Sequence, residues 1–364
     1  MSQTTKRSAK LFDGRDLFYF DDAGSSLPAE RATDTRPADV RPAVAQMRLD
    51  SLTGDWISVA AARQNRAFLP PAHQCPLCPT TTENLSEVPD VFDVAVFENK
   101  SPSFGPTLLA TDDPNYAVEP KLQLGATRDS IGRCEVVVFS PEHTGSLGAM
   151  PVQRVRTVID AWTDRTAHLL TLPGVRQVFP FENRGQEIGV TLHHPHGQIY
   201  SYPYLTPRTT KLMDSLAKFG NDLFAKTLEF EQASERVLIK GDNFTAYVPF
   251  AARWPIELHL LPHRHIGDFT ALTDDERAEL AVIYKRLLEG LDRLYPTPTP
   301  YISAWHQAPR VTGGENVRLQ LQITSPRRAA DKLKYLAGSE SAMGAFIADL
   351  APEVIAGNLR EAIQ

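Results

Sequence analysis

Two histidines and a glutamine at alternate positions near the middle of the chain are the residues most able to do chemistry. They are His194, His196 and Gln198. In an extended strand, residues two apart project from the same face. Two imidazoles and an amide side by side are suited to holding a phosphate or a metal ion, and they are an unusual filling for an apolar core. Pro195 fixes a backbone angle, and Gly197 allows close approach of the backbone.

A second candidate site is the pair Cys75 and Cys78, with two residues between them in a proline-rich segment. A redox pair of this spacing usually opens a helix in a βαβ unit, and neither feature is seen here. Structural zinc takes four ligands from cysteine and histidine, and the chain has no second pair of this kind. His143, after a strand-like run, and His194 stand in suitable settings. These residues leave open a Cys-Cys-His-His metal site and a pair of buried thiols.

Arg63 and Arg66 stand three residues apart, just after an expected strand. Guanidinium groups bind phosphate oxygens in a fork geometry, so this pair is a candidate phosphate site. The alternative is a pair of solvated surface charges.

Composition limits the classes of function. The chain has 364 residues, 42% of them hydrophobic, and a net charge of −6, so it has a core but no large positive field for nucleic acid. No apolar run approaches the roughly 18 residues of a membrane span, and no apolar segment follows the basic residues near the N-terminus. Three cysteines argue against a disulfide scaffold. We expect a cytoplasmic protein that binds neither nucleic acid nor membrane.

Periodicity predicts a similar order of elements in both halves of the chain. The expected strands lie at 47–49, 56–59, 92–99, 134–139, 177–183 and 193–200, and then at 236–239, 245–248, 257–261 and 317–323. The expected helices begin at about 151, run from 209 to 232, and follow a capping box at Thr273 and Glu276.

The same order of elements thus occurs twice: a strand, a Pro-x-His sequence, a helix, and a strand with polar residues at alternate positions. In the second copy, residues 317–323 take the place of the histidine motif. We infer a duplicated domain whose second copy has lost the histidines. We expect a flexible or loosely docked arm at 1–45, with Phe18–Phe20 tucked in, and domains at 46–206 and 207–364.

The central motif resembles the signature of the galactose-1-phosphate uridylyltransferase family, a branch of the histidine triad superfamily. The five residues from His194 to Gln198 carry the resemblance, and flanking stretches support it at Leu52–Trp56, Trp254–Pro255 and Trp305–Pro309. The resemblance covers the chain from about residue 47 to about 345. It implies an α+β fold of duplicated histidine-triad-like domains, with antiparallel sheets flanked by helices and usually paired into a homodimer.

The resemblance also implies roles for individual residues. It makes His196 the nucleophile that carries uridylate from UDP-glucose to galactose 1-phosphate in galactose metabolism, with Gln198 steadying the phosphoryl oxygens. The ligands that it implies for one structural zinc ion are Cys75, Cys78, His143 and His194. The substrate-binding residues that it implies are Arg63, Arg66, Asn99, Asn183, Thr191, Lys334, Tyr335, Gly338 and Glu340.

Some members of this family carry a second metal site, made by a glutamate and three histidines. His265 remains here, whereas Leu212, Gln320 and Gln322 stand where the other ligands would be. We therefore predict no second metal ion.

Gln198 restricts the chemistry. Hydrolases of this superfamily have a histidine at this position, which can protonate a leaving group, whereas an amide cannot act as an acid. A sugar 1-phosphate needs no proton to leave, because its second pKa is about 6. We therefore predict double displacement through a uridylyl-His196 intermediate, with glucose 1-phosphate leaving and galactose 1-phosphate then accepting the uridylate.

Two other functions remain open. A related nucleotide-sugar or dinucleotide phosphorylase, or an adenylyltransferase, would use the same His196 and Gln198, and only its base pocket and acceptor would differ. A non-catalytic, zinc-stabilised nucleotide-binding module would bind its ligand without turnover and would lose little binding in a His196→Ala variant.

Overall fold

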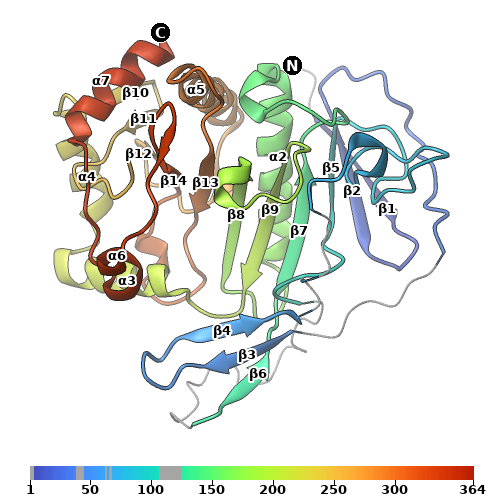
Figure 1. The fold of residues 1–364 in the computed structure, drawn as a ribbon, viewed down its shortest axis with the longest axis horizontal. Coiled ribbons are helices and arrows are strands. Elements are labelled where there is room, and N and C mark those ends of the chain that lie inside the picture. Colours follow the sequence, from blue (N-terminus) through green and yellow to red (C-terminus); the bar gives the residue numbers. More distant parts are fainter. Residues whose placement is uncertain (1–3, 38–44, 62–63, 65–67, 106–123) are drawn as a thin grey trace.

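The computed structural model describes residues 4–37, 45–61, 64, 68–105 and 124–364. In this part of the chain one 11-stranded antiparallel sheet has the order β1-β2-β5-β7-β9-β8-β13-β14-β12-β11-β10 (Figure 1). Its strands are β1 (Thr5–Lys10), β2 (Asp16–Asp21), β5 (Val94–Glu98), β7 (Arg133–Val138), β9 (His196–Tyr202), β8 (Gln177–Arg184), β13 (Tyr301–His306), β14 (Gln320–Ser325), β12 (Ile256–Pro262), β11 (Phe244–Tyr247) and β10 (Val237–Lys240).

The strand order is symmetric about the seam where β8 pairs with β13. From that seam outward, β8, β9, β7 and β5 on one side correspond to β13, β14, β12 and β11 on the other. In chain order each set is two strands, a helix and two strands, with α2 (Val152–Leu169) in the first set and α5 (Asp274–Arg293) in the second. This arrangement confirms the predicted duplication, and the α+β fold with antiparallel strands is as expected. The domain boundaries at 46–206 and 207–364 stay a prediction.

Helices α2, α5 and α7 (Pro352–Ile363) share the main apolar core with one face of the sheet. The apolar stripe of α2 places Trp162 against Trp305 of β13, with ring centroids 6.1 Å apart. The capping box predicted for α5 is present, because Thr273 accepts from the Glu276 N–H and the Glu276 carboxylate accepts from the Thr273 N–H. The helices therefore cover one face of the sheet.

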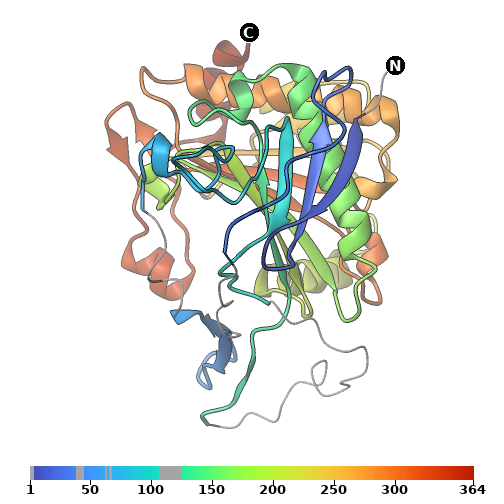
Figure 2. The same cartoon turned by 90° about the vertical axis from the view of Figure 1, so that its right-hand side faces the viewer.

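Two further parts of the chain pack against the opposite face of the sheet. Figure 2 shows α2 and the segment around residues 72–90 on opposite sides of the strands, and Cys75 and Leu77 of that segment pack against β2 and β5. In the second half, α3 (Pro207–Phe219) and α4 (Leu223–Gln232) share a small apolar cluster with Tyr247 and Leu261.

The remaining elements are short. The hairpin predicted at 47–59 is confirmed as β3 (Gln46–Leu49) and β4 (Trp56–Val59), and β6 (Thr127–Asp129) joins it. Another hairpin, of β15 (Arg327–Ala329) and β16 (Lys332–Leu333), precedes α6 (Gly338–Met343). In the described residues no helix has the length and apolar character needed to cross a membrane.

The prediction of a flexible arm was wrong for residues 4–37. Strand β2 pairs with β1 on one side and with β5 on the other, so the N-terminal residues extend the main sheet. Phe18, Tyr19 and Phe20 are buried, as expected. The polar sequence of β1 concealed the strand, because β1 lies at the sheet edge and its side chains are largely exposed.

The single helix predicted at 209–232 was also wrong. Helix α3 ends before Gly220, whose N–H bonds to the Leu216 carbonyl and whose φ is 102°. That backbone angle is accessible to glycine at little cost. Asp222 then precedes α4, so the chain turns between two helices.

Candidate active site

His196 is the first residue of β9, and its ring is held in one tautomer. Its Nδ1 lies 2.7 Å from the backbone carbonyl oxygen of His194. A carbonyl oxygen only accepts, so Nδ1 carries the hydrogen and Nε2 keeps a lone pair. Burial lowers the pKa of His196, although the bond to the His194 carbonyl opposes this shift. A neutral ring with a free Nε2 is the form that can attack an electrophile.

The residue between His196 and Gln198 has to be small. A Cβ on Gly197 would lie 2.8 Å from Cζ of Phe139 and 2.8 Å from the carbonyl oxygen of Phe181. A larger residue would therefore displace β9 from its neighbours. With glycine there, Gln198 pairs directly with Phe181 of β8.

His194 lies just before β9, where it is buried. The strand was predicted from residue 193, and this start was wrong because Pro195 has no N–H for strand pairing. Nε2 of His194 donates to the Ser140 carbonyl at 2.7 Å, so the lone pair is on Nδ1. Burial lowers the pKa of His194 to about 4, which keeps that lone pair available.

The four expected metal ligands come together in the fold. One ligand atom each from Cys75, Cys78, His143 and His194 lies within 4.8 Å of all the others. The Cys78 sulfur is 3.5 Å from Nδ1 of His143 and 3.4 Å from Nδ1 of His194, and the Cys75 sulfur is 3.7 Å from the latter. Two thiols and two imidazoles are a donor set that suits tetrahedral zinc. No second cluster of this kind occurs in the part of the chain that the structure describes.

The surroundings of these ligands fit a cation. Burial, and then the neighbouring Cys75 sulfur, raise the pKa of Cys78 to about 12, so this thiol stays protonated unless a positive charge lies beside it. The backbone N–H of Leu77 points to the Cys75 sulfur at 3.5 Å, a contact that stabilises a thiolate. The carbonyl that accepts from His194 fixes its ring as a metal ligand requires.

Two cavities share four lining residues, which are Asn183, Val190, Leu192 and His196. Cavity A, of about 530 Å³, is bordered by Leu77, Glu87, Asn99, Phe181, Gln198 and Tyr200 among others. Cavity B, of about 570 Å³, is bordered by Gly145, Ser146, Glu182, Gln186, His194 and Pro298 among others. A molecule in cavity A therefore has access to both His196 and Gln198.

Five of the predicted catalytic and substrate-binding residues line cavity A. They are Asn99, Asn183, Thr191, His196 and Gln198. Arg63 and Arg66 lie outside the described residues. The individual contacts of these side chains with a substrate stay a prediction.

The other four predicted substrate-binding residues line neither cavity. Lys334 forms an ion pair with Glu340 at 2.7 Å, and the bond from Lys334, followed by backbone N–H bonds, lowers the pKa of Glu340 to about 2. Gly338 begins α6, and the side chain of Tyr335 is largely exposed. Within one chain, these residues are therefore separate from His196.

The sequence reasoning missed several residues of cavity A. Phe181 and Tyr200 each stand two positions from a predicted site residue on the same strand, so alternation could have identified them. Their rings meet edge to face, with centroids 5.0 Å apart. Glu87 had no such signal, because it lies outside the strands and its partners come from the N-terminal segment.

In the second half, a hydrogen-bonded network occupies the position equivalent to the histidine motif. Nε2 of Gln322 donates to Oε1 of Glu257 at 2.7 Å, and Nε2 of His259 lies 3.0 Å from the same oxygen. Nε2 of His306 lies 3.1 Å from Oε1 of Gln322. Burial alone would raise the pKa of Glu257, but the bond and charge of His259, with further hydrogen bonds, lower it to about 2.

His265 is not part of this network. It is exposed, and its Nε2 donates to the Glu315 carbonyl at 2.8 Å. The histidine beside Gln322 is instead His306 of β13. That His265 keeps a ligand position of a second metal site stays untested. That there is no second metal ion stays a prediction.

Two family models match most of the chain. The model for the N-terminal domain of galactose-1-phosphate uridyl transferase matches residues 34–206, and the model for the C-terminal domain matches residues 204–361. The galactose-1-phosphate uridylyltransferase of Streptomyces lividans is 43% identical over 312 residues, which are 84% of this chain and 81% of that protein. The enzyme of this name from Thermotoga maritima is 34% identical over 326 residues, 87% and 98% of the two chains.

Solved structures show the same architecture. A uridylyltransferase structure has a TM-score of 0.74 at 31% identity, covering 88% of this chain and 98% of the other. An ADP-glucose phosphorylase from Arabidopsis thaliana shares the fold, with a TM-score of 0.67 at 22% identity over 86% of this chain and 97% of the other. With both domain models matched and relatives this similar over most of its length, the chain belongs to the galactose-1-phosphate uridylyltransferase family.

Proposed function

We propose that this protein moves uridylate from UDP-glucose to galactose 1-phosphate by double displacement at His196. The observation that carries the proposal is the bond from Nδ1 of His196 to the His194 carbonyl. It leaves a lone pair on Nε2 of a residue that lines cavity A. Family membership supports the choice of substrates, because the relatives are named for this reaction.

In the first step, Nε2 of His196 forms a bond to the α-phosphorus of UDP-glucose. The bond from that phosphorus to the bridging oxygen breaks, and glucose 1-phosphate leaves with the electron pair. In the second step, a phosphate oxygen of galactose 1-phosphate attacks the same phosphorus, and the bond to Nε2 breaks to give UDP-galactose. No proton has to be transferred in either step, so the Gln198 amide serves as a hydrogen-bond donor to phosphoryl oxygens.

We propose that one zinc ion binds Cys75, Cys78, His143 and His194. Four protein ligands leave no open coordination position, so the ion would supply structural rigidity to the segment that leads into β9. The residues that do the chemistry are then His196 and Gln198, held in place by the backbone of the metal cluster.

We propose a cytoplasmic homodimer that binds neither nucleic acid nor membranes. The residues Lys334, Tyr335, Gly338 and Glu340 are compatible with a substrate-binding role only if a second copy presents them to cavity A. Mixing a His196→Gly chain with a Tyr335→Ala chain tests this, because a mixed dimer would contain one complete site. Activity that stays absent on mixing two inactive but folded variants would contradict the shared site.

The test of the proposed function is a mass spectrum of the intact protein after mixing with UDP-glucose alone. We expect one acid-labile uridylyl adduct on the peptide that holds His196, an equal release of glucose 1-phosphate, and loss of the adduct on adding galactose 1-phosphate. An adduct formed only with an adenine nucleotide would favour the phosphorylase function. Nucleotide binding without any adduct would favour a non-catalytic module.

A further inference from the structure

The N-terminal segment reaches the wall of cavity A. The turn between β1 and β2 is closed by bonds from the Leu11 N–H to the Arg15 carbonyl and from the Gly14 N–H to the Leu11 carbonyl. Leu11 belongs to the same buried cluster as Leu77, which lines cavity A. The family model for the N-terminal domain begins its match only at residue 34, so this turn precedes the matched region.

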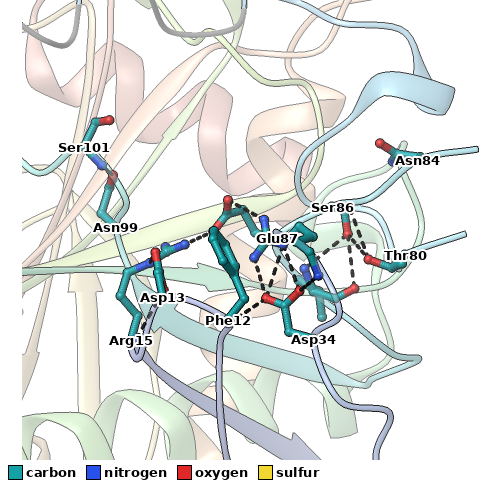
Figure 3. Close-up of polar contacts among 12 residues, drawn as sticks. Phe12, Asp13, Arg15, Asp34, Thr80, Asn84, Ser86, Glu87, Asn99 and Ser101 are labelled. Atoms are coloured by element: carbon teal, nitrogen blue, oxygen red, sulfur yellow. Dashed lines mark hydrogen bonds and ion pairs between the residues drawn. The ribbon is translucent and has the colours of Figure 1, made fainter. Parts of the chain in front are cut away.

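Arg15 is buried at the end of this turn, and its guanidinium has a partner on every side. Nε donates to Asp13 at 2.6 Å, one terminal nitrogen donates to the Glu98 carbonyl at 2.7 Å, and the other donates to Oε2 of Glu87 at 2.5 Å. Figure 3 shows Asp13, Arg15 and Glu87 in this cluster. The side chain of Arg15 is 0% exposed, so water cannot replace a lost partner.

Arg36 holds the other oxygen of the same carboxylate. It donates to Oε1 of Glu87 at 2.8 Å and forms an ion pair with Asp34 at 2.8 Å. Its guanidinium also lies 4.5 Å from the centre of the Phe12 ring. Both oxygens of Glu87 are therefore bound by arginines of the N-terminal segment.

These bonds fix two stretches of the wall of cavity A. Glu87 lines the cavity, and its backbone N–H bonds to the carbonyl of Pro76, which also lines it. The carbonyl of Glu98 that Arg15 binds immediately precedes Asn99, whose Oδ1 accepts from the Ser101 N–H at 2.9 Å. One buried guanidinium thus links the segment after Cys75 to the end of β5.

We propose that Arg15 is a positioning residue for the nucleotide sugar in cavity A, acting through Glu87 and the Glu98 carbonyl. This inference rests on the proposed function, because it takes cavity A to be the substrate site. Without the Arg15 guanidinium, the carboxylates of Asp13 and Glu87 would each lose a positively charged partner. The residues of the cavity wall would then have to shift. An altered wall weakens substrate binding without removing His196 or Gln198.

The test compares Arg15→Gln with Arg7→Gln in the full chain. Arg7 is the matched control, because it forms an ion pair with Asp21 in the same hairpin and does not line cavity A. We expect Arg15→Gln to raise KM for UDP-glucose about tenfold while kcat changes less than about twofold. The Arg7 variant should change neither constant.

A second variant separates positioning from folding. Glu87→Gln keeps the shape of the carboxyl group and removes its charge, and we expect it to raise KM as well. The double variant should raise KM by less than the product of the two single increases, because the two residues share one contact. A KM increase equal to that product would overturn the inference. So would KM values in folded Arg15→Gln and Glu87→Gln proteins that equal the KM of Arg7→Gln.

Direct binding distinguishes this inference from the proposed function. We would measure the Kd of UDP-glucose by calorimetry in a His196→Gly background, where no transfer occurs. Absence of transfer by the wild type would overturn the proposed function. A Kd that is unaffected by adding Arg15→Gln would overturn the role of Arg15 alone.

Discussion

His196 donates its Nδ1 hydrogen to the carbonyl oxygen of His194, while His194 presents its own Nδ1 to the sulfurs of Cys75 and Cys78. The ring proposed to attack the substrate is therefore oriented by the backbone of a residue in the candidate metal cluster. A displacement of about 1 Å can reduce an enzymatic rate about 100-fold. Metal binding and catalysis should therefore be coupled through this one backbone group.

Replacement of the nucleophile is the first prediction. His196→Gly should fold, retain its metal and lose uridylyl transfer by at least about 10³-fold, because no other group can carry the uridylate. The measurement is the exchange rate together with the intact mass after adding UDP-glucose. His168→Ala, which changes an exposed histidine of α2, is the control and should keep full activity. Normal exchange in His196→Gly would show that the nucleophile has been wrongly assigned.

Loss of a metal ligand is the second prediction. Cys75→Ser should lower the zinc content and the melting temperature together, because the binding free energy of structural zinc contributes to folding. Elemental analysis and thermal unfolding measure the two effects. Cys134→Ser changes a buried cysteine of β7 that lies outside the cluster, so it should keep one zinc ion per chain. Full zinc occupancy in Cys75→Ser would contradict the ligand assignment.

The third prediction concerns the addition of a methyl group at Gly197 of β9. Gly197→Ala would place a Cβ 2.8 Å from the Phe181 carbonyl oxygen, so β9 has to shift and carry His196 and Gln198 with it. We expect a loss of about 1–3 kcal/mol in unfolding free energy and a lower kcat. Gly357→Ala, in open space on α7, should be neutral or slightly stabilising. Wild-type kcat in Gly197→Ala would argue against tight positioning of β9.

The fourth prediction is that the protein loses stability at acidic pH through Glu257 in the second half of the chain. The pKa of Glu257 is about 2 in the fold, lower than its ordinary value of 4.5, so the carboxylate stabilises the protein above pH 4.5. This stabilisation, about 3 kcal/mol, should be lost as the pH falls from about 4.5 to about 2. Urea unfolding at several pH values measures it.

Between these pH values, the stability of the Glu257→Gln variant should decrease less than that of the wild type. Glu229→Gln, which changes an exposed residue of α4, serves as the control and should follow the wild type. A Glu257→Gln variant with an unchanged pH dependence would mean that the network around Gln322 does not hold the carboxylate ionised.

The sequence predicted the features that depend on local periodicity. The alternation of His196 and Gln198 placed both on β9, and the stripe of α2 and the capping box of α5 were found at the expected positions. The start of β9 was missed because one proline outweighed the run of alternate residues around it. In such cases the preferences of neighbouring residues oppose each other. The outcome shifts the first or last residue of a strand or helix and does not change the fold.

Contacts between distant segments could not be predicted in the same way. Arg15 and Glu87 are 72 residues apart, and nothing in the spacing of either residue indicates the other. The polar strand β1 has no apolar alternation, so its pairing with β2 becomes visible only in the sheet.

Strand β1 forms one edge of the large sheet, and its side chains include Lys6, Arg7 and Lys10. Charged side chains on an edge strand discourage another sheet from pairing with it. Every residue of β5, two places inward, is buried. Without the N-terminal hairpin, β5 would become an apolar edge able to recruit further copies of the chain. The hairpin therefore also protects the protein against aggregation, a property that truncation at residue 34 would remove.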